Sequence, residues 1–140
     1  MTNRLTVERD CAALVAGFAY HIDNGHYADV LNLFAPDGSF ERPGISARGQ
    51  AEIDAMLRAR PSDVATRHVC GPPLFLSTSD AEASAVTYFT LYQVPVGDGP
   101  YPEFAGPAAI AEYRDHFVLT PMGWRFASRR VSVAMVRATA

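Results

Sequence analysis

Two long segments of alternating apolar and polar residues dominate the C-terminal part of the chain. They span residues 108–120 and 124–136, and only Pro121-Met122-Gly123 lies between them. Because successive side chains of a β-strand point to opposite faces, this alternation predicts two strands. A connection of this length joins antiparallel neighbours. The chain is therefore expected to build its fold around an antiparallel hairpin.

Further strand-like segments precede this hairpin. Residues 82–94 alternate over a long run that is rich in Val, Thr, Tyr and Phe. Residues 64–70 have the same texture, Pro72-Pro73 interrupts it, and residues 74–78 resume it. Long strands with proline breaks favour a sheet that coils into a cone.

The first sixty residues are expected to contain three helices. Apolar residues recur at three- and four-residue spacing over residues 6–24, and Gly25 suits the left-handed residue that follows a helix end. A second, shorter helix is expected within residues 27–34 and a third at residues 49–60, with a short strand at residues 38–43 between them.

This order of elements defines the expected fold class. Helices gather in the first half of the chain and antiparallel strands in the second, which is an α+β arrangement. We predict a cone-shaped α+β barrel, in which three N-terminal helices pack on a strongly curved, mostly antiparallel sheet and enclose a cavity. The length of 140 residues fits a single domain, residues 1–140.

Composition and charge exclude several classes of partner. The net charge is −3 and the chain has no basic run, so nucleic acid is not an expected partner. No apolar run reaches the length of a membrane span, and the N-terminus lacks the pattern of a signal peptide. The two cysteines, Cys11 and Cys70, are too few for a disulfide framework. We expect free thiols in a cytoplasmic protein.

Asp23 lies at the end of the first predicted helix, directly before Asn24-Gly25. The helix macrodipole is negative there, so a carboxylate costs about 0.3–1 kcal/mol. On a helical projection Asp23 is a boundary residue, about 100° or more from the centre of the apolar stripe. It can face the rim of a cavity and serve chemistry. Asp-Asn-Gly is also a common turn composition, and a role in the turn alone is the alternative.

His68 lies in the strand-like segment 66–70, where it shares a face with Thr66 and Cys70. Imidazole is the usual general base near neutral pH, and a carboxylate bonded to one ring nitrogen fixes its tautomer. A pair formed by Asp23 and His68 would also relieve the charge mismatch at the helix end. A structural histidine that only satisfies its own hydrogen bonds is the alternative.

The other histidines give no metal-binding pattern. His21 and His26 are five residues apart with Gly25 between them, and His116 lies on a predicted strand. The chain also lacks a CxxC pair, a glycine-rich phosphate loop and a dinucleotide fingerprint. We therefore expect neither a metal nor another cofactor.

Two groups of aromatic residues on the predicted strands are candidates for substrate contacts. Tyr88 and Tyr92 share one strand face, and Tyr113 shares another with Asp115 and Phe117. A tyrosine face that lines the cavity would supply phenol donors that polarise a substrate oxygen. Aromatic packing of the sheet is the alternative. Four arginines are expected on a solvated sheet face or an interface: Arg114, Arg125, Arg129 and Arg130.

Four loose motifs follow one another in an order that is fairly specific for one fold. They are residues 23–44, Gly49 with Ile53, residues 66–69 and residues 113–131. Together they resemble the SnoaL-like branch of the nuclear transport factor 2-like superfamily. This resemblance implies a cone of three helices and a bent sheet, and a homodimer or higher homo-oligomer.

The resemblance also implies a site. Dehydratase-type members of the superfamily place an aspartate at the end of the first helix and a histidine after the third, which correspond to Asp23 and His68. Scytalone dehydratase has a tyrosine just before the aspartate, where this chain has Ile22. It also has a second histidine on the following long strand, where this chain offers Tyr92 or Gln93.

The missing donors would then come from Tyr20, Tyr88 or Tyr92, and we favour the last two. The predicted function is a cofactor-independent lyase of the dehydratase type. It would act on a small, largely apolar cyclic or carbonyl substrate through the Asp23–His68 pair. An isomerase or polyketide cyclase with the same cavity is one alternative. A non-catalytic ligand-binding or assembly module, such as the small subunit of a ring-hydroxylating dioxygenase, is the other.

Overall fold

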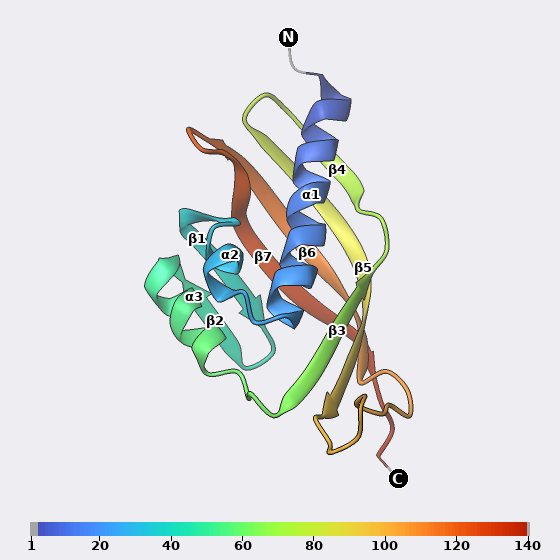
Figure 1. The fold of residues 1–140 in the computed structure, drawn as a ribbon. Helices are drawn as coiled ribbons and strands as arrows, with labels where there is room; N and C mark the ends of the chain where they lie inside the picture. The colour runs from blue at the N-terminus through green and yellow to red at the C-terminus, as the bar shows by residue number, and fades with distance from the viewer. Residues whose placement is uncertain (1–2, 140) are drawn as a thin grey trace.

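The computed structural model describes residues 3–139, and its elements follow the predicted order (Figure 1). In chain order they are α1 (Arg4–Asp23), α2 (Tyr27–Leu31), β1 (Phe34–Arg42), β2 (Ile45–Arg48), α3 (Gly49–Arg58), β3 (Val64–Cys70), β4 (Leu74–Thr78), β5 (Glu82–Pro95), β6 (Ala109–Thr120) and β7 (Gly123–Val136). Helix α1 crosses the sheet, and α2 and α3 lie beside it near β1 and β2 (Figure 1). The predicted α+β class, with helices packed on a curved sheet, is confirmed.

The strands between residues 3 and 139 form one mixed sheet in the order β2-β1-β7-β6-β5-β3, and β4 also pairs with β5. Strands β1 and β7 are parallel, and the other pairs are antiparallel. The sheet is therefore mostly antiparallel, as predicted. It is not closed into a barrel, because β2 and β3 lie at opposite edges and do not pair.

The break at Pro72-Pro73 divides one line of pairing into two strands. β3 pairs with the C-terminal half of β5, where His68 is opposite Leu91. β4 pairs with the N-terminal half, where Phe75 is opposite Ala85. Proline has no N–H to donate to a strand ladder, which explains the interruption. β3 lies at the edge of the sheet, next to the C-terminal end of α1 (Figure 1).

Strand β2 is absent from the predicted elements, and β1 begins four residues before the predicted strand. β1 starts at Phe34 and forms a hairpin with β2, in which Phe40 is opposite Ala47. Gly44 in the turn has φ +80°, a left-handed conformation that glycine adopts without steric penalty. A strand of only four residues is too short for alternation to identify.

The core lies between α1 and the sheet. The ring of Phe18 contacts four other aromatic rings, those of Phe34, Phe40, Tyr113 and Phe126. The predicted apolar stripe of α1 is buried, and so is Val7 one turn before it; the stripe consists of Cys11, Leu14, Val15, Phe18 and Ile22. Burying such side chains contributes about 1.5–3 kcal/mol each. This packing fixes the position of α1 and therefore of its C-terminal residue.

The predicted placement of Arg129 on a solvated face or an interface is wrong. Arg129 is 1% exposed, and it lies opposite Asp115. The register of β6 with β7 shifts between Phe126 and Ser128, so Ala127 is an extra residue in β7. A bulge of one residue exchanges the faces of all residues that follow it. Arg129 is therefore turned inward, although strict alternation from Phe126 would turn it outward.

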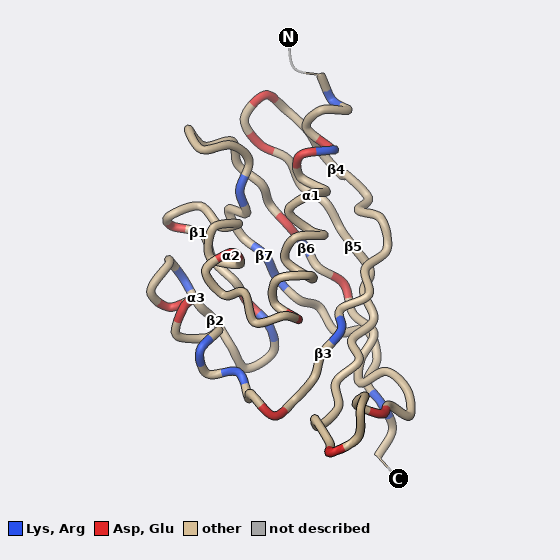
Figure 2. The backbone as a smooth tube through the Cα atoms, in the orientation of Figure 1, with Lys and Arg blue, Asp and Glu red and all other residues tan. Residues whose placement is uncertain are grey.

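Charged residues of both signs are distributed along the chain (Figure 2). None of the helices between residues 3 and 139 has the length and apolar character that crossing a membrane requires.

Candidate active site

The structure brings Asp23 and His68 into direct contact. Asp23 is the last residue of α1 and His68 lies in the middle of edge strand β3. His68 Nδ1 is 2.6 Å from Asp23 Oδ1, and the two side chains are 10% and 4% exposed. The backbone N–H of His68 donates to Asp23 Oδ2 at 2.8 Å. One carboxylate thus binds both the ring and the backbone of the same residue, which fixes the orientation of the imidazole.

A third donor completes the surroundings of the Asp23 carboxylate. The hydroxyl of Thr66 donates to Asp23 Oδ1 at 2.9 Å, and Arg60 Nη2 in turn donates to Thr66 Oγ1 at 3.2 Å. Burial alone would raise the pKa of Asp23. The bonds from the His68 ring and amide, the charge of His68 and the Thr66 bond outweigh burial and lower this pKa. Asp23 is therefore an ionised carboxylate, despite the unfavourable helix dipole.

The contact with an ionised Asp23 determines the tautomer of His68. A carboxylate only accepts, so Nδ1 of His68 carries the proton and donates it to Asp23. In the neutral ring Nε2 then has a free lone pair. Nε2 has no hydrogen-bond partner among the described residues, and His68 lines an open cleft of about 380 Å³. This arrangement matches a general base with an orienting carboxylate.

The cleft lies between one face of α1 and the edge strand β3. It is lined by Ala16, Ala19, Tyr20, Asp23, Asn24, Arg67 and His68. Its volume fits a small molecule. Tyr20 and Arg67 are the lining residues with donor side chains, and Nη1 of Arg67 donates to the carbonyl of Thr66 at 2.8 Å. The amide of Asn24 is already engaged with the carbonyl of Tyr20, at 2.8 Å.

Helical spacing could have identified part of this lining. Ala16, Tyr20 and Asp23 are four and three residues apart, so they share one face of α1. Arg67 could not be found in this way, because strand alternation places it on the face opposite to His68. Arg67 nevertheless lines the cleft, and it is an exposed residue of the edge strand β3.

The structure does not bring Tyr88 and Tyr92 to the Asp23–His68 pair. His68 is opposite Leu91, and Arg67 is opposite Tyr92, so both tyrosines lie on the other face of the sheet. Tyr88 is 72% exposed. Tyr92 packs edge-on against Phe104, with 5.1 Å between ring centroids. Alternation shows that these tyrosines share a face, but it does not show which face the helices cover.

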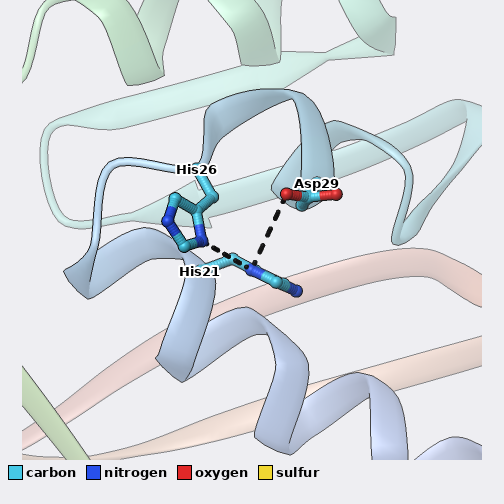
Figure 3. A group of neighbouring side chains, drawn as sticks. All are labelled: His21, His26 and Asp29. Carbon is cyan, nitrogen blue, oxygen red and sulfur yellow. Dashed lines mark hydrogen bonds and ion pairs between the residues drawn. The ribbon is translucent and has the colours of Figure 1, made fainter.

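The structure brings together three other side chains that the sequence spacing does not connect. His21 and His26 have their Nδ1 atoms 3.1 Å apart, and His21 Nδ1 is 3.9 Å from Asp29 Oδ2 (Figure 3). His21 belongs to the last turn of α1, His26 precedes α2, and Asp29 lies in the first turn of α2. The sequence signal for this cluster is the glycine turn between the two histidines, because the turn brings His26 back beside His21.

The open mixed sheet and the helices that cover it define the fold class of the protein. It has the cone-like fold of the nuclear transport factor 2-like superfamily. The SnoaL-like domain family matches residues 3–130, and the chain belongs to this family. Comparison with curated proteins finds no match.

Solved structures of the same fold come from several bacteria. A protein of Novosphingobium aromaticivorans, provisionally assigned as a scytalone dehydratase, is 19% identical with a TM-score of 0.81, covering 97% of this chain and 89% of its own. A nuclear transport factor 2-like superfamily protein from Salmonella enterica is 17% identical with a TM-score of 0.79, over 97% and 96% of the chains. The beta subunit of a provisionally assigned aromatic-ring-hydroxylating dioxygenase, also from N. aromaticivorans, is 17% identical with a TM-score of 0.75, over 96% and 94%. At these identities the likeness establishes the fold.

Proposed function

We propose that this protein is a cofactor-independent lyase of the dehydratase type, with His68 as its general base and Asp23 as the positioning residue. The observation that supports this is the 2.6 Å contact between His68 Nδ1 and Asp23, which leaves Nε2 free at the cleft. A substrate that fits is a small, largely apolar cyclic or carbonyl compound with a hydroxyl group β to the carbonyl. The similarity in fold to the N. aromaticivorans protein is consistent with this reaction class.

The proposed reaction removes the elements of water and needs no oxidant. His68 Nε2 takes the proton from the carbon next to the carbonyl, and the electrons of that C–H bond form an enolate. The enolate then forms the C=C bond as the C–O bond to the hydroxyl breaks. The hydroxyl leaves as water with the proton from His68. Tyr20 and Arg67 are the donors at the cleft that would stabilise the enolate oxygen.

Proton removal can be tested before the natural substrate is known. Wild-type protein is incubated in D₂O with a panel of cyclic ketones and β-hydroxy ketones, and deuterium uptake and water loss are followed by mass spectrometry. His68→Ala should lower the exchange rate at least about 10²-fold, since it removes the base. Asp23→Asn should lower it about 10²–10⁴-fold, since an amide no longer holds the ring in the required tautomer.

Tyr88→Phe is the matched control, because it changes an exposed residue on the other face of the sheet. It should exchange deuterium at the wild-type rate. Folded His68→Ala and Asp23→Asn variants that also keep this rate would refute the mechanism. Deuterium uptake without loss of water from any β-hydroxy ketone would instead favour the isomerase or cyclase alternative, because that reaction uses the same proton transfer.

The exposed side of the sheet supports a second candidate, a non-catalytic assembly subunit. Val69 is 57% and Tyr88 72% exposed, and such residues are enriched at interfaces when they gather on one face. The similarity in fold to the dioxygenase beta subunit is consistent with this role. Sedimentation of the purified chain tests the predicted homodimer. A monomer that sediments with a larger chain on co-expression would favour the assembly role.

A further inference from the structure

A turn between α1 and α2 folds His26 back onto His21. The N–H of His26 donates to the carbonyl of His21 at 2.9 Å, and Gly25 has φ +72°. A second bond joins the Gly25 N–H to the carbonyl of Ile22 at 3.4 Å. These two bonds form a Schellman motif, which places side by side the residues three positions before and two positions after the helix cap. Here both residues are histidines.

The ligand atoms of this cluster converge on a small volume. One ring nitrogen each of His21 and His26 and a carboxylate oxygen of Asp29 lie within 4.8 Å of one another (Figure 3). Bonds of about 2.0–2.1 Å are typical for zinc and imidazole, so nitrogens 3.1 Å apart would subtend roughly 100° at a shared ion. That angle lies between the octahedral and tetrahedral values. Asp29 is 62% exposed, so its carboxylate is free to move closer than 3.9 Å.

Without an ion the two histidines satisfy each other only in part. Two Nδ1 atoms 3.1 Å apart form a hydrogen bond when one carries a proton and the other does not. When both are unprotonated, two lone pairs face each other. A divalent cation accepts both lone pairs at once, and the Asp29 carboxylate balances part of its charge.

We propose that His21, His26 and Asp29 bind one divalent transition-metal ion of the zinc, cobalt or nickel type. Three ligands from the protein leave the remaining coordination positions to water. The ion would join the end of α1 to the start of α2. Tyr20 packs edge-on against both imidazoles, with centroids 5.4 and 5.9 Å away, and so orients the two ligand rings.

The location gives this ion a structural role next to the candidate active site. His21 is two residues before Asp23, and Tyr20 lines the catalytic cleft as well as packing on the histidines. Bound metal would therefore restrain the helix end that carries the positioning carboxylate. The ion is not placed in the proposed reaction, and the site stands whether or not the chain is a lyase.

Zn²⁺ and Co²⁺, each added alone, are the probes that test this proposal. Tag-free, chelator-treated protein is titrated with Zn²⁺ by calorimetry and with Co²⁺ by visible absorption. We expect one ion per chain, and at least about tenfold weaker binding for His21→Ala and for His26→Ala, since each removes a ligand. Asp29→Asn should weaken binding less, because Asp29 lies farther from the histidines. Circular dichroism verifies that each variant is folded.

His116→Ala is the matched control, because His116 is also a surface histidine beside a carboxylate, Glu82, at 3.0 Å. It should bind zinc like the wild type. Nitrogen NMR of the histidine rings in wild-type protein is independent of any variant, and it should show zinc on Nδ1 of His21 and His26. The proposal is refuted if the doubly substituted His21→Ala/His26→Ala protein binds zinc as tightly as the wild type, or if zinc shifts His116 instead.

Discussion

Two carboxylate pairs lie on the helix-covered side of the sheet, one with an arginine and one with a histidine, and they differ in what each leaves free. Asp115 and Arg129 are joined by two bonds of 2.8 and 3.0 Å, and both side chains are fully buried. Asp23 and His68 are nearly as buried, but His68 lines an open cleft and its Nε2 has no hydrogen-bond partner among residues 3–139. A sealed pair can only stabilise or specify the fold. A pair with one open side can also exchange a proton with a bound molecule.

The aromatic surroundings strengthen this difference. The guanidinium carbon of Arg129 lies 3.5 Å from the ring centroid of Tyr113 and 4.5 Å from those of Phe18 and Phe126. Rings on several sides stabilise the cation through their faces and exclude water. His68 has only Phe89 as an aromatic neighbour among the described residues, at 5.8 Å. Aromatic rings therefore enclose the Arg129 cation, whereas the His68 ring has an aromatic neighbour on one side only.

The largest expected effect is a loss of stability when the Asp115–Arg129 pair is broken. Arg129→Met leaves the Asp115 carboxylate buried without a partner, which should lower the free energy of unfolding by about 3–5 kcal/mol. Urea unfolding measures it. Arg130→Ala is the control, because Arg130 is the exposed next residue of β7 and should change stability by less than about 0.5 kcal/mol.

A double variant distinguishes the cost of an unpaired buried charge from the cost of lost packing. Asp115→Leu/Arg129→Met removes both charges, so it should be more stable than Arg129→Met alone. Equal or lower stability of the double variant would show that packing against Phe18 and Tyr113, rather than the unpaired charge, dominates the loss.

The next effect, about 1–3 kcal/mol at neutral pH, is expected for Asp23→Asn, which weakens three accepted bonds. The pKa of Asp23 is lowered in the folded protein, so its ionised form favours folding above the pKa of an unfolded Asp, about 3.9. That contribution is lost as the pH falls through the lower, folded pKa. Between pH 7 and acid, wild-type protein should therefore lose more stability than Asp23→Asn.

Urea unfolding at a series of pH values measures this difference. Asp37→Asn is the control, because Asp37 is exposed and should leave the acid dependence unchanged. Parallel acid profiles for the wild type and Asp23→Asn would contradict the assignment of an ionised, hydrogen-bonded carboxylate at the helix end.

The two pairs also differ in how far the sequence could predict them. Asp23 and His68 were recognisable because a charge mismatch at a helix end, a strand histidine and a family resemblance agreed. Arg129 was not, because a one-residue bulge at Ala127 reverses the faces of β7 and leaves no mark in the alternation. Tyr88 and Tyr92 show the same limit. Periodicity groups residues by face, while tertiary packing decides which face is covered.

The fold itself was largely predictable, because periodicity identifies long strands and helices. Long periodic segments such as β5, β6 and β7 have their pattern repeated many times, and their predicted ends lie within a residue or two of the observed ones. β2, with four residues, repeats it too few times. The cluster of His21 and His26 needs a turn geometry, which spacing along a helix does not describe.

The smallest effect is expected for a substitution of Gly25. This residue follows the helix end that carries Asp23, so a change there can disturb the Asp23–His68 pair and leave the Asp115–Arg129 pair intact. Gly25 has φ +72°, and a Cβ added there meets no atom within 4 Å, so Gly25→Ala brings backbone strain without a clash. The strain should lower the free energy of unfolding by about 1 kcal/mol. If Asp23 depends on this helix end, deuterium exchange should slow as well, while the Asp115–Arg129 pair is unaffected.

Gly97→Ala is the control, because Gly97 has the same open space without a positive φ. Stability lost with a wild-type exchange rate would show that the bonds to Thr66 and His68 hold Asp23 in place without the turn.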